Sequence, residues 1–535
     1  MELIDYESVI SPGSIEQSPI SLTTTEVNIT GSWKIFKPLL EKGIAPCSVK
    51  CPLKIKIPDY IYELVKKNEV KALNLLREYN PIPAVLGRVC PHFCMNGCNR
   101  SLIDAPLHTG YIEQYLGDIG LDLPYLKPQL TTNSHVAVIG SGPAGIGAAY
   151  FLSKYGVKVT VYEKEEKVGG LLRYGIPSYR LSKDILDAEL DNLFKSFQIN
   201  VVVNQEIKKD DILNLMKDHK MIFFAPGLNE SIFPSKLEGE KRVLKGLELL
   251  NMINKGHSVQ GKSFAVIGGG NVAVDVARSL LRLGKKVEVL YRRTYNEMPA
   301  YEEEKAQMLK EGVVLRERTL VGEVNEKESS LTIVLHKAVN DNGEIVSGEP
   351  YCEIQVDYLV FAIGQKKSVS VQENESLFMG GDYLIGASSV AESLATGKEG
   401  AIKILNALKE EKKEFPNEDP LMCKVITPES VHLDYVKKSE PIKLQEISPH
   451  KSIKSFISIY PPINKTMVEP EIERCITCGI CNGCGLCWFF CPDNAIVLEP
   501  EGNNFKVKVL LEHCKGCGIC SNVCPRGIIN MKEDK

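Results

Sequence analysis

The feature that most constrains this chain is a cysteine pattern that occurs twice near its C-terminus. The first run reads Cys481-x2-Cys484-x2-Cys487-x3-Cys491-Pro492, and the same spacing recurs from Cys514 to Cys524. Such loops bring three thiolates onto one [4Fe-4S] cubane, while the fourth cysteine of each run binds the other cubane. Zinc would favour two Cys-x2-Cys pairs over eight interleaved cysteines. The predicted ligand sets are Cys481, Cys484, Cys487 and Cys524 for one cluster, and Cys514, Cys517, Cys520 and Cys491 for the other.

Composition narrows the class of protein. The length of 535 residues predicts several domains, and 64 basic against 68 acidic residues give no electrostatic case for binding nucleic acid. The sequence has no apolar run of the ~18 residues that a membrane span needs. Because the polar N-terminus also lacks a secretory signal, we expect a cytoplasmic protein, in which most of the 17 cysteines serve as metal ligands rather than forming disulfides.

Seven of the remaining nine cysteines form two smaller groups, and Cys352 and Cys423 stand alone as ordinary thiols. Five lie between Cys47 and Cys98, in a segment of helical pattern with too little apolar material for a large core, so that metal ligation would help to hold it together. Cys475 and Cys478 precede the C-terminal runs with the same spacing. The spacing leaves open whether they bind metal or are bystanders.

The middle of the chain carries two glycine-rich turns between apolar and helical runs. Residues 135–139 read as a buried strand, followed by Gly140-Ser141-Gly142-Pro143-Ala144-Gly145 and a helical run. Glycines there allow a tight turn and close approach to a pyrophosphate at the helix N-terminus. The next strand ends at Glu163, whose carboxylate could accept hydrogen bonds from ribose hydroxyls. The alternative is a strand-to-helix turn without a ligand.

The second turn, Gly268 to Ala273, follows the apolar run 264–267. The strand after it ends in Arg292-Arg293, where a site for NAD usually offers an acid. Two guanidinium groups there could bind a 2′-phosphate, which favours NADP over NAD. The alternative is that both arginines form surface ion pairs.

Taken together, these motifs resemble the flavoproteins with two dinucleotide domains, and within them the small subunit of glutamate synthase and its relatives. These relatives include the large subunit of NADH-dependent ferredoxin:NADP oxidoreductase and the flavin half of dihydropyrimidine dehydrogenase. The resemblance rests on both glycine turns and on Gly169 to Pro177, Tyr291-Arg292-Arg293, Met298-Pro299-Ala300, Ala362-Ile363-Gly364 and Gly381-Asp382. It implies FAD in the first site and NADP or NAD in the second. Disulfide reductases keep a redox cysteine pair beside the flavin, but no such pair lies between 132 and 410.

The expected fold is α/β, with two Rossmann-like dinucleotide-binding domains, an N-terminal helical iron-sulfur domain and a C-terminal bacterial ferredoxin-like α+β domain. The expected boundaries are an arm at 1–30, the helical domain at 31–130, the FAD domain at 131–250 and 371–410, the NAD(P) domain at 251–370, a linker at 411–468 and the ferredoxin-like domain at 469–535.

The predicted site residues follow from the motifs and the resemblance together. Those for FAD are Gly140, Gly142, Pro143, Ala144, Gly145, Glu163, Lys164, Gly170, Leu171, Leu172, Arg180, Gly381 and Asp382. Those for NAD(P) are Gly268, Gly270, Asn271, Val272, Ala273, Arg292, Arg293 and Gly364. No catalytic proton donor is predicted.

The resemblance also bears on the N-terminal cysteines. The relatives usually hold two [4Fe-4S] clusters there and use an additional Cys-x2-Cys upstream, but this chain has no cysteine before Cys47. We therefore expect one N-terminal cluster on Cys51, Cys90 and Cys94, with Cys98, Cys47 or Gln114 as the fourth ligand. Gln114 resembles a glutamine ligand of one relative. Five structural thiols without metal are the alternative.

The predicted function is that of an electron-transfer flavoprotein subunit connecting NAD(P)H, FAD and [4Fe-4S] clusters with a ferredoxin or a partner subunit in a hetero-oligomeric complex. The C-terminal runs resemble the delta subunit of 2-oxoacid:ferredoxin oxidoreductases, which makes a 2-oxoacid oxidoreductase a candidate partner. The alternatives are an NADPH-oxidising glutamate synthase small subunit and a non-catalytic iron-sulfur scaffold.

Overall fold

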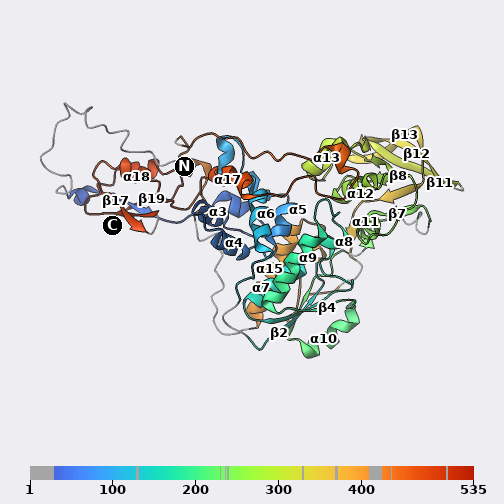
Figure 1. Ribbon diagram of the computed structural model, residues 1–535, viewed down its shortest axis with the longest axis horizontal. Coiled ribbons are helices and arrows are strands. Elements are labelled where there is room, and N and C mark those ends of the chain that lie inside the picture. Colours follow the sequence, from blue (N-terminus) through green and yellow to red (C-terminus); the bar gives the residue numbers. More distant parts are fainter. Residues whose placement is uncertain are drawn as a thin grey trace.

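In the computed structural model, an N-terminal helical domain lies between two parallel sheets on one side and a small C-terminal module on the other (Figure 1). The structure describes residues 29–127, 132–228, 230–234, 237, 240–327, 330–367, 371–408, 424–434, 436–501 and 504–534. Almost all of the predicted N-terminal arm, and the start of the predicted linker, lie outside these residues. No helix in the described ranges is long and apolar enough to cross a membrane. The predicted α/β class is confirmed.

The first sheet has five parallel strands and carries the first glycine turn. In spatial order the strands are β16 (Leu377–Met379), β5 (Met221–Phe224), β2 (His135–Ile139), β3 (Lys158–Tyr162) and β4 (Asn200–Val202). Val136 and Val138 pack into the main core, whereas Ala137 and Ile139 pack into a second cluster on the opposite face. The apolar run of β2 is therefore buried on both faces, as parallel sheets require.

Helices α7 (Pro143–Lys154) and α15 (Val390–Ala407) pack tightly against each other beside this sheet. A Cβ atom at Gly397 would lie 2.2 Å from the Ala144 carbonyl oxygen, and one at Gly147 would lie 2.8 Å from that of Leu394. Only glycine allows the two backbones to approach so closely. Four more helices complete the described part of the domain: α8 (Leu171–Tyr174), α9 (Lys183–Phe197), α10 (Ile212–Asp218) and α14 (Asp382–Ile385).

The second sheet is also parallel and is inserted between β5 and β16. Its strands, in spatial order, are β10 (Val314–Arg316), β9 (Lys286–Leu290), β8 (Ser263–Ile267), β14 (Tyr358–Phe361) and β7 (Val243–Lys245). Its helices are α11 (Gly246–Asn254), α12 (Asn271–Arg282) and α13 (Glu302–Glu311). A pair of short antiparallel strands, β6 (Glu230–Ser231) and β15 (Gln365–Lys366), connects the two domains.

The insertion begins earlier than the expected residue 251, because β7 and α11 belong to the second sheet. A three-residue strand shows too little periodicity to be assigned to a sheet from sequence. A three-stranded antiparallel sheet of β11 (Thr319–Lys327), β12 (Ser330–Asp341) and β13 (Glu344–Val356) covers one face. Its residues Leu331, Ile333 and Leu335 share a core with Ala265 and Leu359 of the parallel sheet.

The N-terminal domain consists of short helices whose core is continuous with that of the FAD domain. The helices are α2 (Pro46–Lys50), α3 (Ile57–Val65), α4 (Glu69–Arg77), α5 (Pro83–Val89), α6 (Thr109–Gly120) and the 3-10 turns η3 (Phe93–Gly97) and η4 (Asn99–Leu102). Glu189 of α9 accepts hydrogen bonds of 2.8 Å from the backbone N–H groups of both Ala84 and Val85. These are otherwise unpaired donors at the start of α5, so a buried carboxylate joins the two domains.

The C-terminal module contains the hairpin β17 (Ile496–Glu501) and β18 (Asn504–Val509), the turns α18 (Leu486–Phe489) and α19 (Ile519–Asn522), and β19 (Ile529–Glu533). Strand β19 pairs antiparallel with β1 (Phe36–Leu40). Residues 36–40, which we expected to open the helical domain, therefore complete a sheet of the ferredoxin-like module. Pairing across nearly the whole chain has no local sequence signal.

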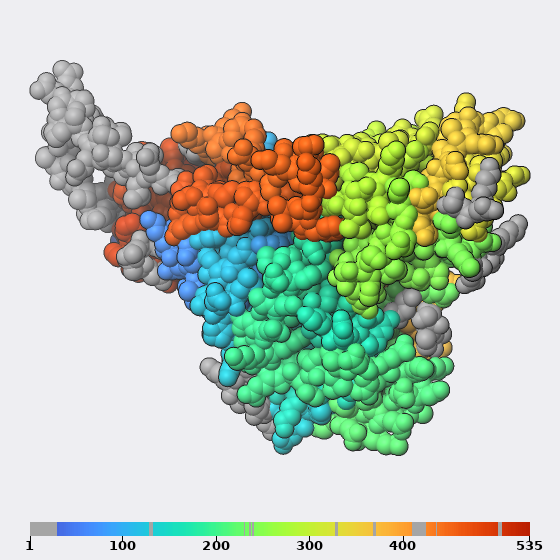
Figure 2. Space-filling view, turned by 45° about the vertical axis from the view of Figure 1, so that its right-hand side comes forward, coloured from blue at the N-terminus to red at the C-terminus, as the bar shows by residue number. Residues whose placement is uncertain are grey.

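The described part of the linker lies along the surface rather than projecting from it. Figure 2 shows its orange residues between the blue helical domain and the yellow-green second domain. Helix α16 (Pro449–Ser452) contacts α13, and Lys310 forms an ion pair of 3.1 Å with Glu446. The linker ends in α17 (Lys465–Glu473), which packs on α3 and α6 and extends past the expected boundary at 468.

Replacing Glu189 tests the junction of α5 with the FAD domain. Glu189→Ala leaves two buried N–H groups unpaired, which should lower the free energy of unfolding by about 2–4 kcal/mol. The measurement is the urea concentration at the midpoint of unfolding, monitored by circular dichroism on the cofactor-loaded protein kept free of oxygen. Asp191→Ala, at an exposed position of the same helix, is the control, and an equal effect of both substitutions would contradict this role.

Candidate functional site

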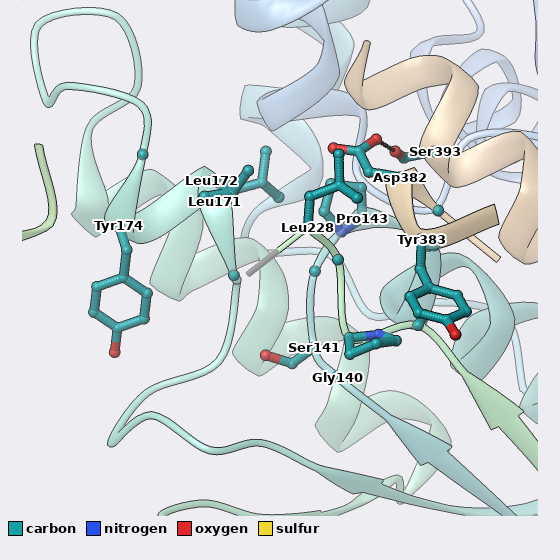
Figure 3. A pocket seen from close by; sticks show the side chains of 18 of the residues that line it. Gly140, Ser141, Pro143, Leu171, Leu172, Tyr174, Leu228, Asp382, Tyr383 and Ser393 are labelled. Atoms are coloured by element: carbon teal, nitrogen blue, oxygen red, sulfur yellow. Dashed lines mark hydrogen bonds between the residues drawn. The ribbon is translucent and has the colours of Figure 1, made fainter. Parts of the chain in front are cut away.

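The turn between β2 and α7 forms one wall of a cavity of about 450 Å³. Gly140 has φ +92°, and a Cβ at Gly145 would lie 1.9 Å from the Gly140 carbonyl oxygen. Gly142 caps α7, and a Cβ built there meets no atom within 4 Å. The first N–H groups of α7 therefore face open space, where a pyrophosphate can bind. Figure 3 shows Gly140, Ser141 and Pro143 around this cavity, opposite Leu171 and Leu172.

Glu163 lies at the end of β3 and is buried in the cavity wall. Its carboxylate accepts hydrogen bonds from the Ser141 N–H (3.0 Å), the Ser141 hydroxyl and the Glu165 N–H (2.9 Å). These contacts fix the carboxylate beside the glycine turn. It stands where the sequence predicts a partner for the ribose of a nucleotide.

Asp382, the first residue of α14, lies on another side of the same cavity. Its carboxylate accepts hydrogen bonds from the hydroxyls of Ser388 (2.6 Å) and Ser393 (2.9 Å; Figure 3), and burial raises its pKa. Gly381 has φ +65°, and a Cβ there would lie 2.9 Å from that of Ala144. Two carboxylates from different segments therefore line the cavity, that of Glu163 after β3 and that of Asp382 at the start of α14.

The glycine-rich return, 169–177, borders the cavity at Gly170, Leu171 and Leu172. A Cβ at Gly170 would lie 2.8 Å from the Gly142 Cα, so the return crosses directly over the first turn. The Lys183 ammonium donates to the carbonyl oxygens of Leu172 (3.0 Å) and Ile176 (2.6 Å), and burial lowers its pKa to about 7. Lys183 therefore positions the return, a role that the motif did not reveal.

Arg180 also lines the cavity, but its guanidinium contacts the second dinucleotide domain. It forms ion pairs with Asp275 of α12 (2.7 Å) and with Glu304 of α13 (2.8 Å). Of the predicted FAD residues, Arg180 is thus the one whose charge joins the two domains. Lys164 lines the cavity at the end of β3.

The second glycine turn approaches the same cavity from the opposite domain. Gly268 has φ +141°, and a Cβ at Gly270, which caps α12, meets no atom within 4 Å. Asn271 and Val272 line the cavity, and the Asn271 side-chain oxygen accepts from the Tyr301 N–H at 2.9 Å. The cavity thus extends from one glycine turn to the other. Ala273 is buried in α12, and Gly364, with φ +119°, follows β14 in the connection between the domains.

The residues present fit a dinucleotide and a flavin. Two buried acceptors on the cavity wall, the Asn251 side-chain oxygen and the Asp275 Oδ1, have no hydrogen-bond partner among the described residues. Buried polar atoms are rarely left unpaired, so these oxygens are suited to donors of a ligand.

Arg292 and Arg293 follow β9, with Arg292 exposed and Arg293 half-buried. Neither forms an ion pair with another residue in the described part of the chain. Arg318, with φ +47°, donates its N–H to the Arg293 carbonyl oxygen at 3.0 Å. Hydrogen bonds from Thr294 lower the pKa of the nearby Glu297, and the charges of Arg293 and Arg318 lower it further. Arg318 is a third cation here, and no motif identified it.

The C-terminal cysteines line two small cavities. Cys481, Cys484, Cys487 and Cys524 surround one, and Cys491, Cys514, Cys517 and Cys520 surround the other. Each cavity thus receives three thiols from one run and the fourth from the other run, the arrangement that suits a pair of cubanes.

The N-terminal cysteines fall into two groups. Burial, followed by the charge of Glu113, raises the pKa of Cys51, Cys90 and Cys94, to about 11 for Cys51. Burial also raises the pKa of Glu113 to about 8. A metal that binds these thiols must therefore displace their protons. Glu113, which the sequence reading missed, is the fully buried carboxyl beside this group.

The candidates for the fourth ligand of the N-terminal cluster, Gln114, Cys47 and Cys98, differ in their surroundings. Gln114 is half-buried, and its backbone packs against Gly87 of α5, where a Cβ would lie 2.4 Å from the Gln114 nitrogen. Burial raises the pKa of Cys47 well above its usual value, and the thiols of Cys98, Cys478 and Cys475 raise it further. Cys47 and Cys98 therefore group with the two cysteines whose role the sequence left open.

Comparison with known proteins agrees with this geometry. Residues 134–400 match the pyridine nucleotide-disulphide oxidoreductase family, residues 40–122 the 4Fe-4S cluster domain II of dihydropyrimidine dehydrogenase, and residues 480–528 the 4Fe-4S dicluster domain. The chain belongs to the pyridine nucleotide-disulphide oxidoreductase family, with iron-sulfur domains on both sides of the flavoprotein core.

Three relatives are similar over most of this chain. The beta subunit of NADP(+)-dependent formate dehydrogenase from Moorella thermoacetica is 29% identical over 508 residues, covering 83% of this chain and 71% of that protein. The beta subunit of NADPH-Fe(3+) oxidoreductase from Geobacter sulfurreducens is 28% identical over 517 residues, covering 82% and 76%. The dihydropyrimidine dehydrogenase subunit PreT from Escherichia coli O157:H7 is 31% identical over 384 residues, covering 67% and 89%.

These findings confirm the predicted class of protein. The chain is an NAD(P)H oxidoreductase with an FAD-containing core, and it carries [4Fe-4S] clusters in its N-terminal and C-terminal domains.

Two glycines test which turn holds which nucleotide. Gly142→Val places a side chain in open space at the first turn and should remove FAD. Gly270→Val should leave FAD bound but raise the KM for NAD(P)H about tenfold or more, since even one lost hydrogen bond to a charged group amounts to about 1.5–3 kcal/mol.

The readouts are flavin content after anaerobic purification and steady-state kinetics with a one-electron dye. Each variant serves as the control for the other. Loss of FAD in both variants, or in neither, would contradict the assignment of the two turns.

Proposed function

We propose that this chain is a ferredoxin:NAD(P) oxidoreductase-type subunit, in which the cavity holds FAD and the helical domain receives its electrons. The observation that carries this proposal is the position of Val89. This last residue of α5 lines the cavity, and Cys90 follows it directly. Burial raises the pKa of Tyr301, which lines the cavity next to the second glycine turn, and Cys90 is among the neighbouring groups that raise it further.

The chemistry of the bound groups requires this arrangement. NAD(P)H delivers two electrons and one proton as a hydride to the flavin, whereas each cubane accepts one electron at a time. The glycine turns orient the two nucleotides toward one cavity, and the ion pairs of Arg180 keep the domains together around it. Cys352 is the single cysteine among the described residues of the two dinucleotide domains, and it lies on β13 outside the cavity. The cavity therefore has no adjacent disulfide as an electron acceptor.

The grouping of the cysteine side chains in the fold supports one ligand set in the helical domain and two in the C-terminal module. Cys51, Cys90 and Cys94 would hold the cluster beside the flavin, and Glu113, which raises the pKa of all three thiols after burial does, or Gln114 would supply an oxygen ligand. The two sets of C-terminal cysteines would hold the clusters from which electrons leave.

Trp488 and Phe489 follow Cys487 directly, and these residues are 43% and 58% exposed. These exposed aromatic side chains form a suitable contact surface for a partner protein.

The partner would be a ferredoxin or a catalytic subunit that oxidises a small organic acid. Two features support this partner: the likeness of the cysteine runs to the delta subunit of 2-oxoacid oxidoreductases, and the similarity to a formate dehydrogenase beta subunit. A glutamate synthase small subunit needs no C-terminal ferredoxin-like module, which makes that role the weaker candidate.

Anaerobic reduction tests the electron-transfer function. NADPH should bleach the flavin of the purified chain and support reduction of ferredoxin or a viologen dye. An unchanged spectrum would favour the scaffold alternative and contradict the proposal.

Anaerobic co-purification tests the partner. Recovery of a catalytic subunit, with NADP reduction driven by a 2-oxoacid or by formate, identifies which acid is oxidised. Recovery of a glutamine-hydrolysing partner would instead support glutamate synthase.

The three arginines after β9 and β10 provide a test of nucleotide preference. Replacing Arg292 and Arg293 by Ala should raise the KM for NADPH about tenfold or more while changing that for NADH little, because the lost contacts are charge-assisted bonds to a 2′-phosphate. Arg318→Ala should also raise the KM for NADPH more than the KM for NADH.

The matched control is Arg316→Ala. Arg316 has the same charge and lies two residues from Arg318, but it pairs with Glu288 at 2.5 Å. Equal effects on NADPH and NADH in the double variant would contradict the 2′-phosphate site.

A further inference from the structure

The segment between the linker and the ferredoxin-like module is attached to the N-terminal helical domain. After α17 the chain forms a tight turn, residues 474–479, here called the docked turn. At its start the Arg474 guanidinium lies 2.9 Å from the Asp104 carboxylate. At its end the Gly43 N–H donates to the Gly479 carbonyl oxygen at 3.1 Å. Both cysteines of the docked turn are thereby fixed to the N-terminal domain.

Four thiols from opposite ends of the chain meet there. Cys478 and Cys47 pack in one hydrophobic cluster, and the Asn99 amide donates to the Cys478 sulfur at 3.5 Å. Cys98 is the residue before Asn99, and Cys475 packs with Cys47 and Cys98 against the main core. Burial raises the pKa of Cys47, and the thiols of Cys98, Cys478 and Cys475 raise it further, ahead of that of Cys94. These four thiols therefore form one group, with Cys94 next to it.

The backbone of the docked turn matches that of the ferredoxin-like loops. In all three loops, the residues two and four positions after the first cysteine have positive φ. The angles are +47° at Thr477 and +81° at Gly479, +71° at Gly483 and +77° at Gly485, and +76° at Gly516 and +78° at Gly518. This conformation is rare for a β-branched residue such as Thr477, so the surroundings must enforce it.

Hydrogen bonds to sulfur follow from this backbone. The Thr477 N–H donates to the Cys475 sulfur at 3.4 Å, and the His92 N–H donates to the Cys90 sulfur at 3.3 Å. Such bonds stabilise thiolate ligands of iron-sulfur clusters. The buried Arg526 donates to the Thr477 hydroxyl at 3.2 Å, which places a positive charge beside the docked turn.

We infer that Cys47, Cys98, Cys475 and Cys478 hold a further [4Fe-4S] cluster, so that the helical domain carries two clusters rather than one. Two of its four ligands come from the N-terminal domain and two from the docked turn before the ferredoxin-like module. Such a cluster ties the linker and the ferredoxin-like module to the helical domain, and it adds to the proposed function without depending on the partner.

The arrangement of the thiols favours a cubane over a single ion. In the described ranges, no three His, Cys, Asp or Glu side chains converge closely enough to hold one metal ion. The same is true of the two C-terminal cavities, which belong to a 4Fe-4S dicluster domain. A cubane spreads its four thiolates over four iron atoms, whereas zinc draws them to one point.

The position of this site gives it a role in electron transfer. Cys478 is three residues from Cys481, so roughly 11 Å of extended chain at most separates the two ligands. Cys90 directly follows Val89, which lines the flavin cavity, and three residues separate Cys51 from Cys47. The ligand sets therefore form a continuous series from the cavity to the ferredoxin-like module, and the inferred cluster is its middle member.

Iron analysis of the full chain tests the inference. The wild-type protein, purified without oxygen, should contain about 16 iron atoms and as many sulfides per FAD, four for each cubane. Cys475→Ala/Cys478→Ala should contain about 12 and keep its FAD. Electron paramagnetic resonance of the dithionite-reduced protein should lose one cluster signal.

Two further variants separate loss of a cluster from a folding defect. Cys47→Ala combined with Cys478→Ala removes ligands from both ends and should also lose about four iron atoms, not eight. Cys352→Ala removes a thiol outside every group and should lose none. In the Cys475/Cys478 variant, NADPH should still bleach the flavin, but reduction of the ferredoxin-like clusters should be slower.

Three results would overturn the inference. The first is a wild-type protein with about 12 iron atoms that the Cys475/Cys478 variant leaves unchanged. The second is one zinc atom per chain that disappears from this variant while its iron remains. The third is equal reduction of the ferredoxin-like clusters in wild type and variant.

Discussion

The electron-transfer function depends on the rigid placement of one short helix, α5, between the flavin cavity and a group of cysteines. Its N-terminus is bound by the buried carboxylate of Glu189, which belongs to the FAD domain. Its C-terminus brings Val89 to the cavity and Cys90 to the thiol group. Because electron transfer requires a fixed, short separation, this packing determines whether a flavin and a cluster can act together.

A second constraint comes from contacts between the chain ends. Strand β1 completes a sheet with β19, and the docked turn attaches the segment before the ferredoxin-like module to the helical domain. The module is too small to be held by its own hydrophobic core. It is therefore not an independent appendage, since its sheet and the neighbouring cysteine turn both use residues from the N-terminal part of the chain.

Sequence reasoning succeeded where the signal was local. The spacing of the cysteine runs and of the glycine turns requires particular backbone conformations. The structure places the eight C-terminal cysteines around two small cavities, and it places residues of both glycine turns at one larger cavity. It failed where contacts join distant segments. The strand at 36–40, the carboxyl of Glu113, the guanidinium of Arg318 and the grouping of Cys475 with Cys47 depend on the tertiary fold. The sequence shows that no cysteine precedes Cys47. It does not show that Cys475 and Cys478 lie next to Cys47 and Cys98 in the fold.

The central claim is that two electrons enter through the cavity and separate onto one-electron carriers. Rapid anaerobic mixing of the oxidised protein with one equivalent of NADPH tests it most directly. The account predicts that flavin absorbance falls and then recovers as cluster absorbance falls by two electrons in total. A flavin that stays fully reduced, beside clusters that stay oxidised, would contradict it.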